Sequence, residues 1–396
     1  MKENTMKKTI LFAFISVILS AGCRWGKIPD YDEFTTVFTQ DRTELYFDDK
    51  RWDFADFLKE EISSHPEMEC VDLYKFCRQA AFGIHSADPE VRKKFFADFN
   101  NAPEKSKNKL IRVTSPDTAR VDIAAWKKAG LPAQWLFNMS IAESEFKDAA
   151  SRFEEYLKIA AKTVAQSNLT FSEQEFRDFA ASLKNSPQKP MPHSDIYRQN
   201  SAPYRIISTR YFNTIPILKH AAKLPESSAP RIIAIDGRSA SGKTTTARQL
   251  KMILNAQIIH MDDFFLPPEL RTEERLAEPG GNVHYERFAA QVLPYIRNNE
   301  AFTYPTFDCS KMQLDGERAV KASPWRIVEG SYSQHPAFED YMDVRVFCHV
   351  DAREQMQRIL IRNGERMAQM FAARWIPMEE KYFEAYDIRK QADFEF

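Results

Sequence analysis

Residues 232–245 combine a strand pattern with a pattern that binds phosphate. The apolar run 232–235 leads into GRSASGKTT at 237–245, which has the spacing GxxxxGKT. Glycines at both ends of such a loop let successive backbone N–H groups face an anion. The lysine then reaches the β- and γ-phosphates, and the threonine hydroxyl binds Mg²⁺. A helix that begins at Lys243 would add the positive end of its dipole.

This loop therefore predicts binding of ATP or GTP with Mg²⁺. The residues assigned to nucleotide binding are Gly237, Arg238, Ser239, Ala240, Ser241, Gly242, Lys243, Thr244 and Thr245. Lys243 is also assigned a catalytic role, because its charge can stabilise a phosphoryl group in transfer.

Carboxylates follow the next two expected strands. Asp262 and Asp263 end the run 257–262, and Glu329 ends the run 325–329. Transfer of a phosphoryl group to a hydroxyl needs a carboxylate that accepts or orients the acceptor proton, together with Mg²⁺. We expect Asp262 to accept or orient the acceptor proton. We also expect it to bind Mg²⁺ together with Thr244 and Glu329. Asp263 is expected to contact the substrate. The alternative for the aspartate pair is a solvated turn.

The turn 278–288 contains adjacent glycines and leads into a predicted helix. Its Asn282 and His284 are candidate contacts to a small acceptor, as is Asp308 further along the chain. The alternative is an ordinary loop with a helix cap.

Arginines follow the fourth expected strand. Arg358 and Arg362 are four residues apart on one predicted helix, a spacing that places them on one face. Such arginines can close over a phosphate in transfer. The alternative is a solvated helix with ion pairs to Glu354 and Glu365.

Strands and helices alternate from Arg231 onward, which predicts a parallel sheet with helices on both faces and ligands at the carboxyl ends of the strands. The expected strands are 231–236, 257–262, 325–329, 344–350 and 392–396, and the expected helices include 243–255 and 352–362.

Residues 31–225 have a different composition, because they contain only Gly83 and Gly130 whereas 226–396 contain seven glycines. Apolar residues recur at helical spacing, which predicts a mainly α-helical domain. The periodic runs are 54–62, 73–80, 153–164 and 176–183. Capping boxes are expected at Ser151 with Glu154 and at Ser172 with Glu175. The proline-containing stretch 225–230 is the expected linker to the second domain, 226–396.

The first 23 residues have the layout of a secretory leader, with three lysines, an apolar stretch and small residues before Cys23. They resemble a bacterial lipoprotein box, although Ser20 stands where an aliphatic residue is usual. An uncleaved membrane-associated tail and a misassigned start are the alternatives. A lipoprotein would reside at the envelope, whereas the use of ATP indicates the cytoplasm.

The net charge and the cysteine content argue against some kinds of partner and site. A formal net charge of −1 argues against a nucleic-acid-binding protein. The five cysteines include no CxxC pair, which argues against a disulfide scaffold and a zinc site.

These motifs resemble the uridine kinase and phosphoribulokinase branch of P-loop kinases. The resemblance covers Arg231 to Phe396 and depends on GRSASGKTT, MDDFF, the turn at Asn282 and IVEG. It implies that Asp262 is the catalytic aspartate, that Glu329 is linked to magnesium, and that Arg358 and Arg362 belong to the lid.

Two departures concern the acceptor. His284 stands where an acidic residue that grips ribose hydroxyls is expected, and Phe307, before Asp308, stands where tyrosine is common. The function expected is an ATP-dependent kinase for a nucleoside-like or other small acceptor. The alternative is a nucleotide-binding sensor or scaffold with little turnover, in which the helical domain contacts a partner.

Overall fold

The computed structural model describes residues 54–83, 88–106, 108–141, 148–183 and 191–396. The predicted leader with Cys23 lies outside these ranges. In the described ranges, no helix combines the length and the apolar character needed to cross a membrane.

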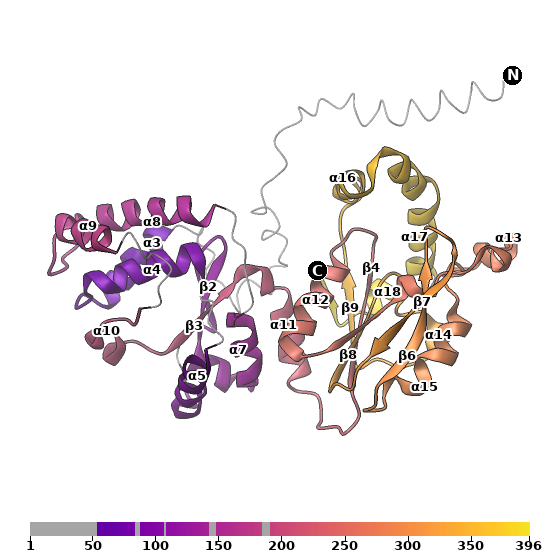
Figure 1. The fold of residues 1–396 in the computed structure, drawn as a ribbon, viewed down its shortest axis with the longest axis horizontal. Helices are drawn as coiled ribbons and strands as arrows, with labels where there is room; N and C mark the ends of the chain where they lie inside the picture. The colour runs from indigo at the N-terminus through magenta and orange to yellow at the C-terminus, as the bar shows by residue number, and fades with distance from the viewer. Residues whose placement is uncertain (1–53, 84–87, 107, 142–147, 184–190) are drawn as a thin grey trace, which may run out of the picture. The chain divides into compact units, whose positions relative to one another are not determined.

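A five-stranded parallel sheet forms the centre of the C-terminal part (Figure 1). Its strands are β4 (Arg231–Gly237), β5 (Gln257–His260), β8 (Trp325–Glu329), β9 (Val344–Cys348) and β10 (Phe394–Glu395). They lie in the order β10-β9-β4-β8-β5. The chain extends from β4 first toward β5 and β8 and later toward β9, so the strand order reverses at β4. In parallel sheets a ligand-binding crevice forms at such a point.

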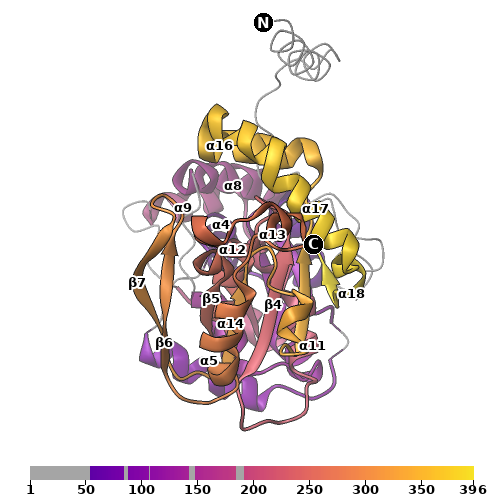
Figure 2. The same cartoon turned by 90° about the vertical axis from the view of Figure 1, so that its right-hand side faces the viewer.

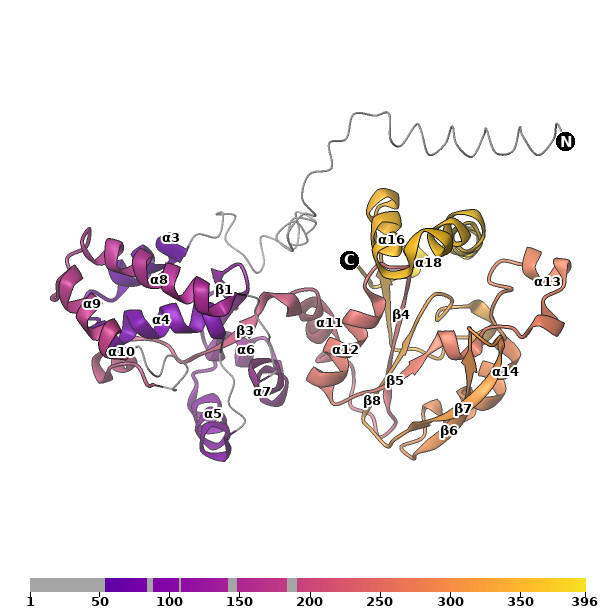
Figure 3. The same ribbon diagram turned by 45° about the horizontal axis from the view of Figure 1, so that its top comes forward.

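Helices and a hairpin surround this sheet. The helices are α12 (Lys243–Leu254), α13 (Glu273–Ala277), α14 (Tyr285–Gln291), α15 (Leu293–Ile296), α16 (Ala352–Met370), α17 (Ile376–Ala385) and α18 (Ile388–Gln391). The hairpin consists of β6 (Phe302–Asp308) and β7 (Gln313–Val320) and stands beside β5 (Figure 2). Figure 3 shows α13, α14 and the hairpin on the same side of the sheet.

The core of this part joins the sheet to its covering helices. Strand residues such as Ile232 and Val328 pack with Phe288 of α14 and Tyr382 of α17, and all four are buried. Strands buried on both faces have continuous apolar sequences, as 232–235 does.

The N-terminal described part contains helices and a small antiparallel sheet. Its helices are α3 (Phe54–Ser64), α4 (Cys70–Phe82), α5 (Pro89–Asn101), α6 (Ile123–Lys128), α7 (Ala133–Ile141), α8 (Ala149–Val164), α9 (Glu173–Ser182), α10 (Asp195–Asn200) and α11 (Thr214–Ala221). Its strands are β1 (Ile111–Ser115), β2 (Thr118–Asp122) and β3 (Tyr204–Ser208), paired in that order. The helices α3, α4, α8 and α9 share one aromatic-rich core.

The structure confirms the predicted α/β sheet and the mainly helical character of the N-terminal part. The four periodic runs correspond to α3, α4, α8 and α9, and the capping box of Ser172 and Glu175 is present. The three short strands β1 to β3 and the hairpin β6–β7 were not predicted.

Several expected boundaries are wrong, and one of them is that of the strand expected over 392–396, which is limited to Phe394–Glu395. The box at Ser151 is absent because α8 already begins at Ala149, after Asp148. The strand expected over 257–262 ends at His260, where residues 261–264 turn into a 3₁₀-helix, and the strand expected over 344–350 ends at Cys348.

Candidate functional site

The loop 237–242 connects β4 to α12, as the sequence predicts. Gly237 has φ 134°, and a Cβ there would lie 2.1 Å from the carbonyl oxygen of Cys348, so only glycine fits. Gly242 has φ 100° and precedes the first residue of α12. These two glycines give the loop its turn.

The loop presents donors that the protein leaves open. In the described chain, no backbone acceptor faces the N–H groups of Ala240, Gly242, Lys243, Thr244 and Thr245. Lys243 lies among them, and its Nζ donates to the carbonyl oxygens of Gly237 and Arg238, both at 2.8 Å. Open N–H groups at a helix N-terminus, together with a lysine, form an anion-binding arrangement.

Glu329 lies beside this loop, at the carboxyl end of β8. The Thr244 hydroxyl donates to Glu329 Oε2 at 3.1 Å, and His260 Nδ1 lies 2.5 Å from Oε1. Burial alone would raise the pKa of the Glu329 carboxyl. The hydrogen bond and charge of His260, with Lys243 and Thr244, outweigh burial and lower this pKa. The site therefore holds a carboxylate and a hydroxyl in contact.

Asp262 follows His260 in the turn after β5 and is exposed. Nearby protein atoms still remove part of the hydration of its carboxylate, and this desolvation raises its pKa. The charge of Glu329 raises the pKa further, and the charge of Lys243 opposes it. Asp262, Glu329 and Lys243 are thus within electrostatic reach of one another, and Asp262 is a stronger base than an ordinary aspartate.

Asp236, which the sequence analysis did not assign to the site, forms hydrogen bonds that hold the start of the loop. Asp236, the last residue before Gly237, is fully buried and accepts hydrogen bonds from Gly237 N at 2.7 Å and from the Tyr382 hydroxyl at 2.9 Å. The backbone N–H groups of Tyr332 and Gln334 also donate to it. Burial raises the pKa of Asp236 to about 6 despite these donors. An aspartate at the end of an apolar strand was the available signal.

Two carboxylates of α17 also form hydrogen bonds with the loop. Glu379 accepts from Ser239 N at 2.9 Å and from the Ser239 hydroxyl at 2.5 Å. Glu380 accepts from Arg238 Nη2 at 2.9 Å. Ser239 and Arg238, both assigned to nucleotide binding, are thus engaged with protein groups. No local pattern around 379–380 marked these contacts in the sequence.

Helix α16 contacts the loop through its first turns. Gln355 Nε2 donates to the carbonyl of Ser239 at 3.1 Å, and Arg358 Nη1 donates to that of Ala240 at 3.0 Å. Arg362 is exposed and its Nε donates to Asn363, so the structure does not bring it to the loop. Gly364 interrupts the helix just beyond, with φ 77°.

The predicted acceptor residues are arranged in separate local networks. Asp263 is buried and accepts from the Tyr304 hydroxyl at 3.0 Å and from Arg318 Nε at 2.7 Å. His284 caps α14 and contacts Glu286.

Asn282 and Asp308, the other two residues predicted to contact the small-molecule acceptor, make hydrogen bonds within their own part of the chain. The carbonyl of Asn282 accepts from Leu266 N, and Asn282 itself is buried. Asp308 accepts from Ser310 N at 2.8 Å and from the Ser310 hydroxyl at 2.6 Å, which stabilises the tip of the hairpin. The structure therefore gives Asp308 a role in its own turn.

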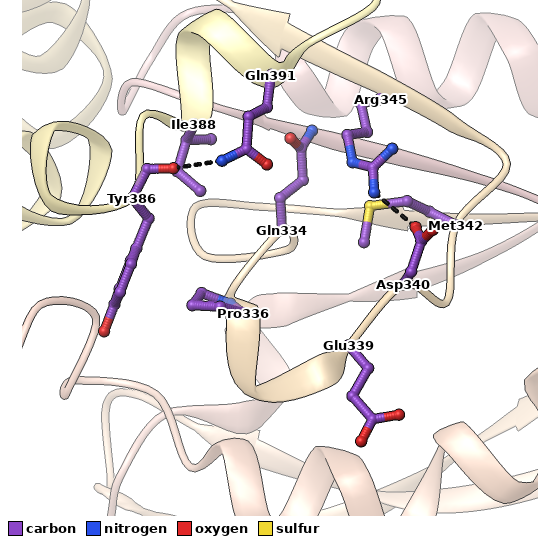
Figure 4. Close-up of a pocket in the computed structure, with 9 residues that line it drawn as sticks. All are labelled: Gln334, Pro336, Glu339, Asp340, Met342, Arg345, Tyr386, Ile388 and Gln391. Atoms are coloured by element: carbon purple, nitrogen blue, oxygen red, sulfur yellow. Dashed lines mark hydrogen bonds and ion pairs between the residues drawn. The ribbon is translucent and has the colours of Figure 1, made fainter.

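A cavity of about 230 Å³ lies elsewhere in this part of the chain (Figure 4). Its lining residues come from the loop before β9, from β9 itself and from the region of α18: Gln334, Pro336, Glu339, Asp340, Met342, Arg345, Tyr386, Ile388 and Gln391. None of the predicted site residues lines it, so it is distinct from the loop site.

The residues at the loop fit a nucleotide with Mg²⁺. The open N–H groups and Lys243 suit a polyphosphate. Thr244, Glu329 and Asp262 carry oxygen atoms that could serve as ligands, since Mg²⁺ in such sites uses one or two carboxylates and completes its shell with phosphate and water.

Comparisons with known proteins relate this chain to kinases over part of its length. No family model matches the chain. A uridine kinase from Chlamydia pneumoniae is 28% identical over 181 residues, which cover 41% of this chain and 79% of that protein. A pantothenate kinase from Listeria welshimeri is 28% identical over 173 residues, which cover 38% of this chain and 55% of that protein.

Among solved structures, one described as a possible uridine kinase from Bacillus stearothermophilus matches 46% of this chain and 96% of its own, at 22% identity and a TM-score of 0.37. This chain is similar in sequence to proteins named uridine kinase and pantothenate kinase. Its own C-terminal part is an α/β fold, with a parallel sheet and a P-loop after β4.

Proposed function

We propose that this protein transfers the γ-phosphate of ATP to a hydroxyl group of a small molecule. The observation that carries the proposal is the row of open N–H groups beside Lys243, with carboxylates at the ends of the two neighbouring strands. One group of these residues suits the phosphates, and the other suits a hydroxyl proton.

The site residues divide the transfer among them, and Asp262 is assigned both the proton and a share of the metal. A bond forms between the acceptor oxygen and the terminal phosphorus, the bond to the diphosphate oxygen breaks, and the hydroxyl proton passes to Asp262. The raised pKa of Asp262 favours this transfer. Lys243 must leave the carbonyls of Gly237 and Arg238 to donate to phosphate oxygens. Thr244, Glu329 and Asp262 would hold Mg²⁺, which supplies neutralisation of phosphate charge.

Arg358 and the carboxylates of α17 position the loop rather than the acceptor. Arg358 and Gln355 donate to two carbonyls of the loop, and Glu379 accepts hydrogen bonds from Ser239. A loop held in this way loses less conformational freedom on binding, which favours affinity.

An acceptor screen tests the proposal. The full chain is incubated with ATP and Mg²⁺ and a panel of nucleosides, sugars, hydroxy acids and vitamin-like alcohols, and the release of ADP is measured. We expect steady release that depends on one acceptor. Nucleotide binding without release on any acceptor would contradict the proposal and favour a sensor or scaffold.

A further inference from the structure

Three arginines contact the segment that follows Asp262. Arg271 Nε donates to the carbonyl of Leu266 at 2.8 Å. The guanidinium of Arg287, on α14, lies 4.5 Å from the centre of the Phe264 ring. Arg318, on β7, donates to Asp263 at 2.7 and 3.3 Å. Residues 263–266 thus receive guanidinium groups from three separate segments of the chain.

The charges in this region do not balance. Arg318 is neutralised by Asp263. Arg271 and Arg287 form no ion pair within the described ranges. Arg287 is 8% exposed, and all three of its guanidinium nitrogens lack a hydrogen-bond partner among the described residues. A buried guanidinium with no partner is costly for the fold, so a role outside the fold is expected of it.

The pKa shifts of Arg287 and Arg271 also indicate positive charges that the protein does not neutralise. Desolvation lowers the pKa of Arg287 to about 10, although the charge of Asp263 opposes this. Desolvation also lowers the pKa of Arg271, and the charge of Arg374 adds to the effect. Arg374 belongs to the π-helical segment Phe371–Trp375 after α16 and is exposed. The protein therefore places the like charges of Arg271 and Arg374 within electrostatic reach of each other, and Arg271 contacts Leu266, four residues after Asp262. Unbalanced positive charges of this kind suit an anionic ligand.

We propose that the acceptor carries an anionic group, a carboxylate or a phosphate, in addition to its hydroxyl. Arg271 binds this group at the segment that follows Asp262, and the buried charge of Arg287 strengthens the attraction. The inference rests on the proposed function, since it names the class of acceptor. Charge-assisted hydrogen bonds from guanidinium groups are the usual means of holding both kinds of anion.

Matched acceptors test the proposal in the full chain. The pairs are D-glycerate with glycerol, ribose 5-phosphate with ribose, and pantothenate with panthenol, and uridine is a further neutral acceptor. With ATP and Mg²⁺, we expect kcat/KM for an anionic member to exceed that of its neutral partner at least tenfold. A carboxylate and a phosphate are told apart by which pair shows the difference. Equal or better use of a neutral acceptor would overturn the proposal.

Variants connect the preference to the arginines. Arg271→Gln should raise KM for the anionic acceptor at least tenfold and leave KM for ATP within twofold of wild type. Arg287→Met should do the same, and if it does not fold, Arg271→Gln carries the test. Arg248→Gln, at an exposed position of α12, is the matched control and should change neither value. A rise in KM for ATP alone would assign Arg271 to the nucleotide and overturn the proposal.

A binding measurement separates this inference from the proposed function. Inorganic phosphate is titrated by calorimetry into the chain saturated with ADP and Mg²⁺, or into the unliganded chain if ADP does not bind. Binding that weakens at least tenfold in Arg271→Gln supports the anion site even if no acceptor is phosphorylated, in which case only the kinase proposal fails. Phosphate binding that is absent, or equal in wild type and variant, would overturn the anion site.

Discussion

Asp262 combines an exposed position with a raised pKa, which is the combination that a general base requires. In Asp262→Asn the side chain keeps its size but cannot accept a proton. We predict a loss of about 10²- to 10⁴-fold in kcat, with the affinity for ATP measured without Mg²⁺ unchanged. Steady-state kinetics and calorimetry measure the two effects.

The control for Asp262 is Asp315→Asn, since Asp315 is exposed on the hairpin and paired with Lys311. It should keep wild-type turnover. Wild-type kcat in Asp262→Asn, on the best acceptor, would show that another group takes the proton.

His260 is the second residue whose role follows from its contacts. Its hydrogen bond keeps the pKa of Glu329 low, so that Glu329 remains charged in mild acid. In His260→Phe this pKa should rise, and the Mg²⁺ concentration for half-maximal activity should increase several-fold, more at pH 5.5 than at pH 7. His260→Asn keeps a donor and should recover much of the loss. An unchanged Mg²⁺ dependence in His260→Phe would contradict the positioning role.

At the scale of elements, the packing of the β4–α12 loop against β9 determines how the loop tolerates substitution. Gly237→Ala combines positive φ with a Cβ only 2.1 Å from the Cys348 carbonyl. Gly242→Ala has positive φ too, but no atom within 4 Å of the added Cβ. We predict a cost of about 1–2 kcal/mol for Gly242→Ala from φ alone, and a clearly larger loss for Gly237→Ala.

Urea unfolding of the two glycine variants isolates the clash from the backbone strain that both share. Equal free energies of unfolding would mean that β9 moves away at no cost and that the close approach is unimportant.

The same elements show what sequence can and cannot predict. The loop 237–245 and the strands β4, β8 and β9 were predicted because local spacing and apolar runs specify them. Asp262 and Glu329 followed from the rule that parallel strands end at one edge.

The missed features depend on contacts between distant segments. Glu379 lies 140 residues from Ser239, so no local pattern connects them. The hairpin β6–β7 has a largely exposed second strand without an apolar alternation, and the sequence therefore gave no strand signal. Arg362 was grouped with Arg358 by helical spacing, but only Arg358 reaches the loop.

For the whole molecule, Asp236 links stability to pH. Its pKa is about 6 in the folded protein and 3.8 in the unfolded chain, so between these values only the folded state holds the proton. Raising the pH through this window therefore removes stability, by about 3 kcal/mol at most.

The contribution of Asp236 is isolated by comparing the wild type with a variant, because other carboxylates titrate in the same pH range. Free energies of unfolding of wild type and Asp236→Asn are compared from pH 4 to pH 7. The difference, wild type minus variant, should fall between pH 4 and pH 6 and stay level above that. A difference independent of pH would mean that Asp236 is charged throughout.

The central claim is that the loop from Gly237 to Thr245 binds a nucleoside triphosphate through open N–H groups and Lys243. Calorimetric titration of the full chain with ATP and Mg²⁺ tests it most directly. We predict one binding site per chain and an affinity at least tenfold weaker in Lys243→Ala. The absence of heat with both ATP and GTP, or an affinity unchanged in Lys243→Ala, would contradict the account.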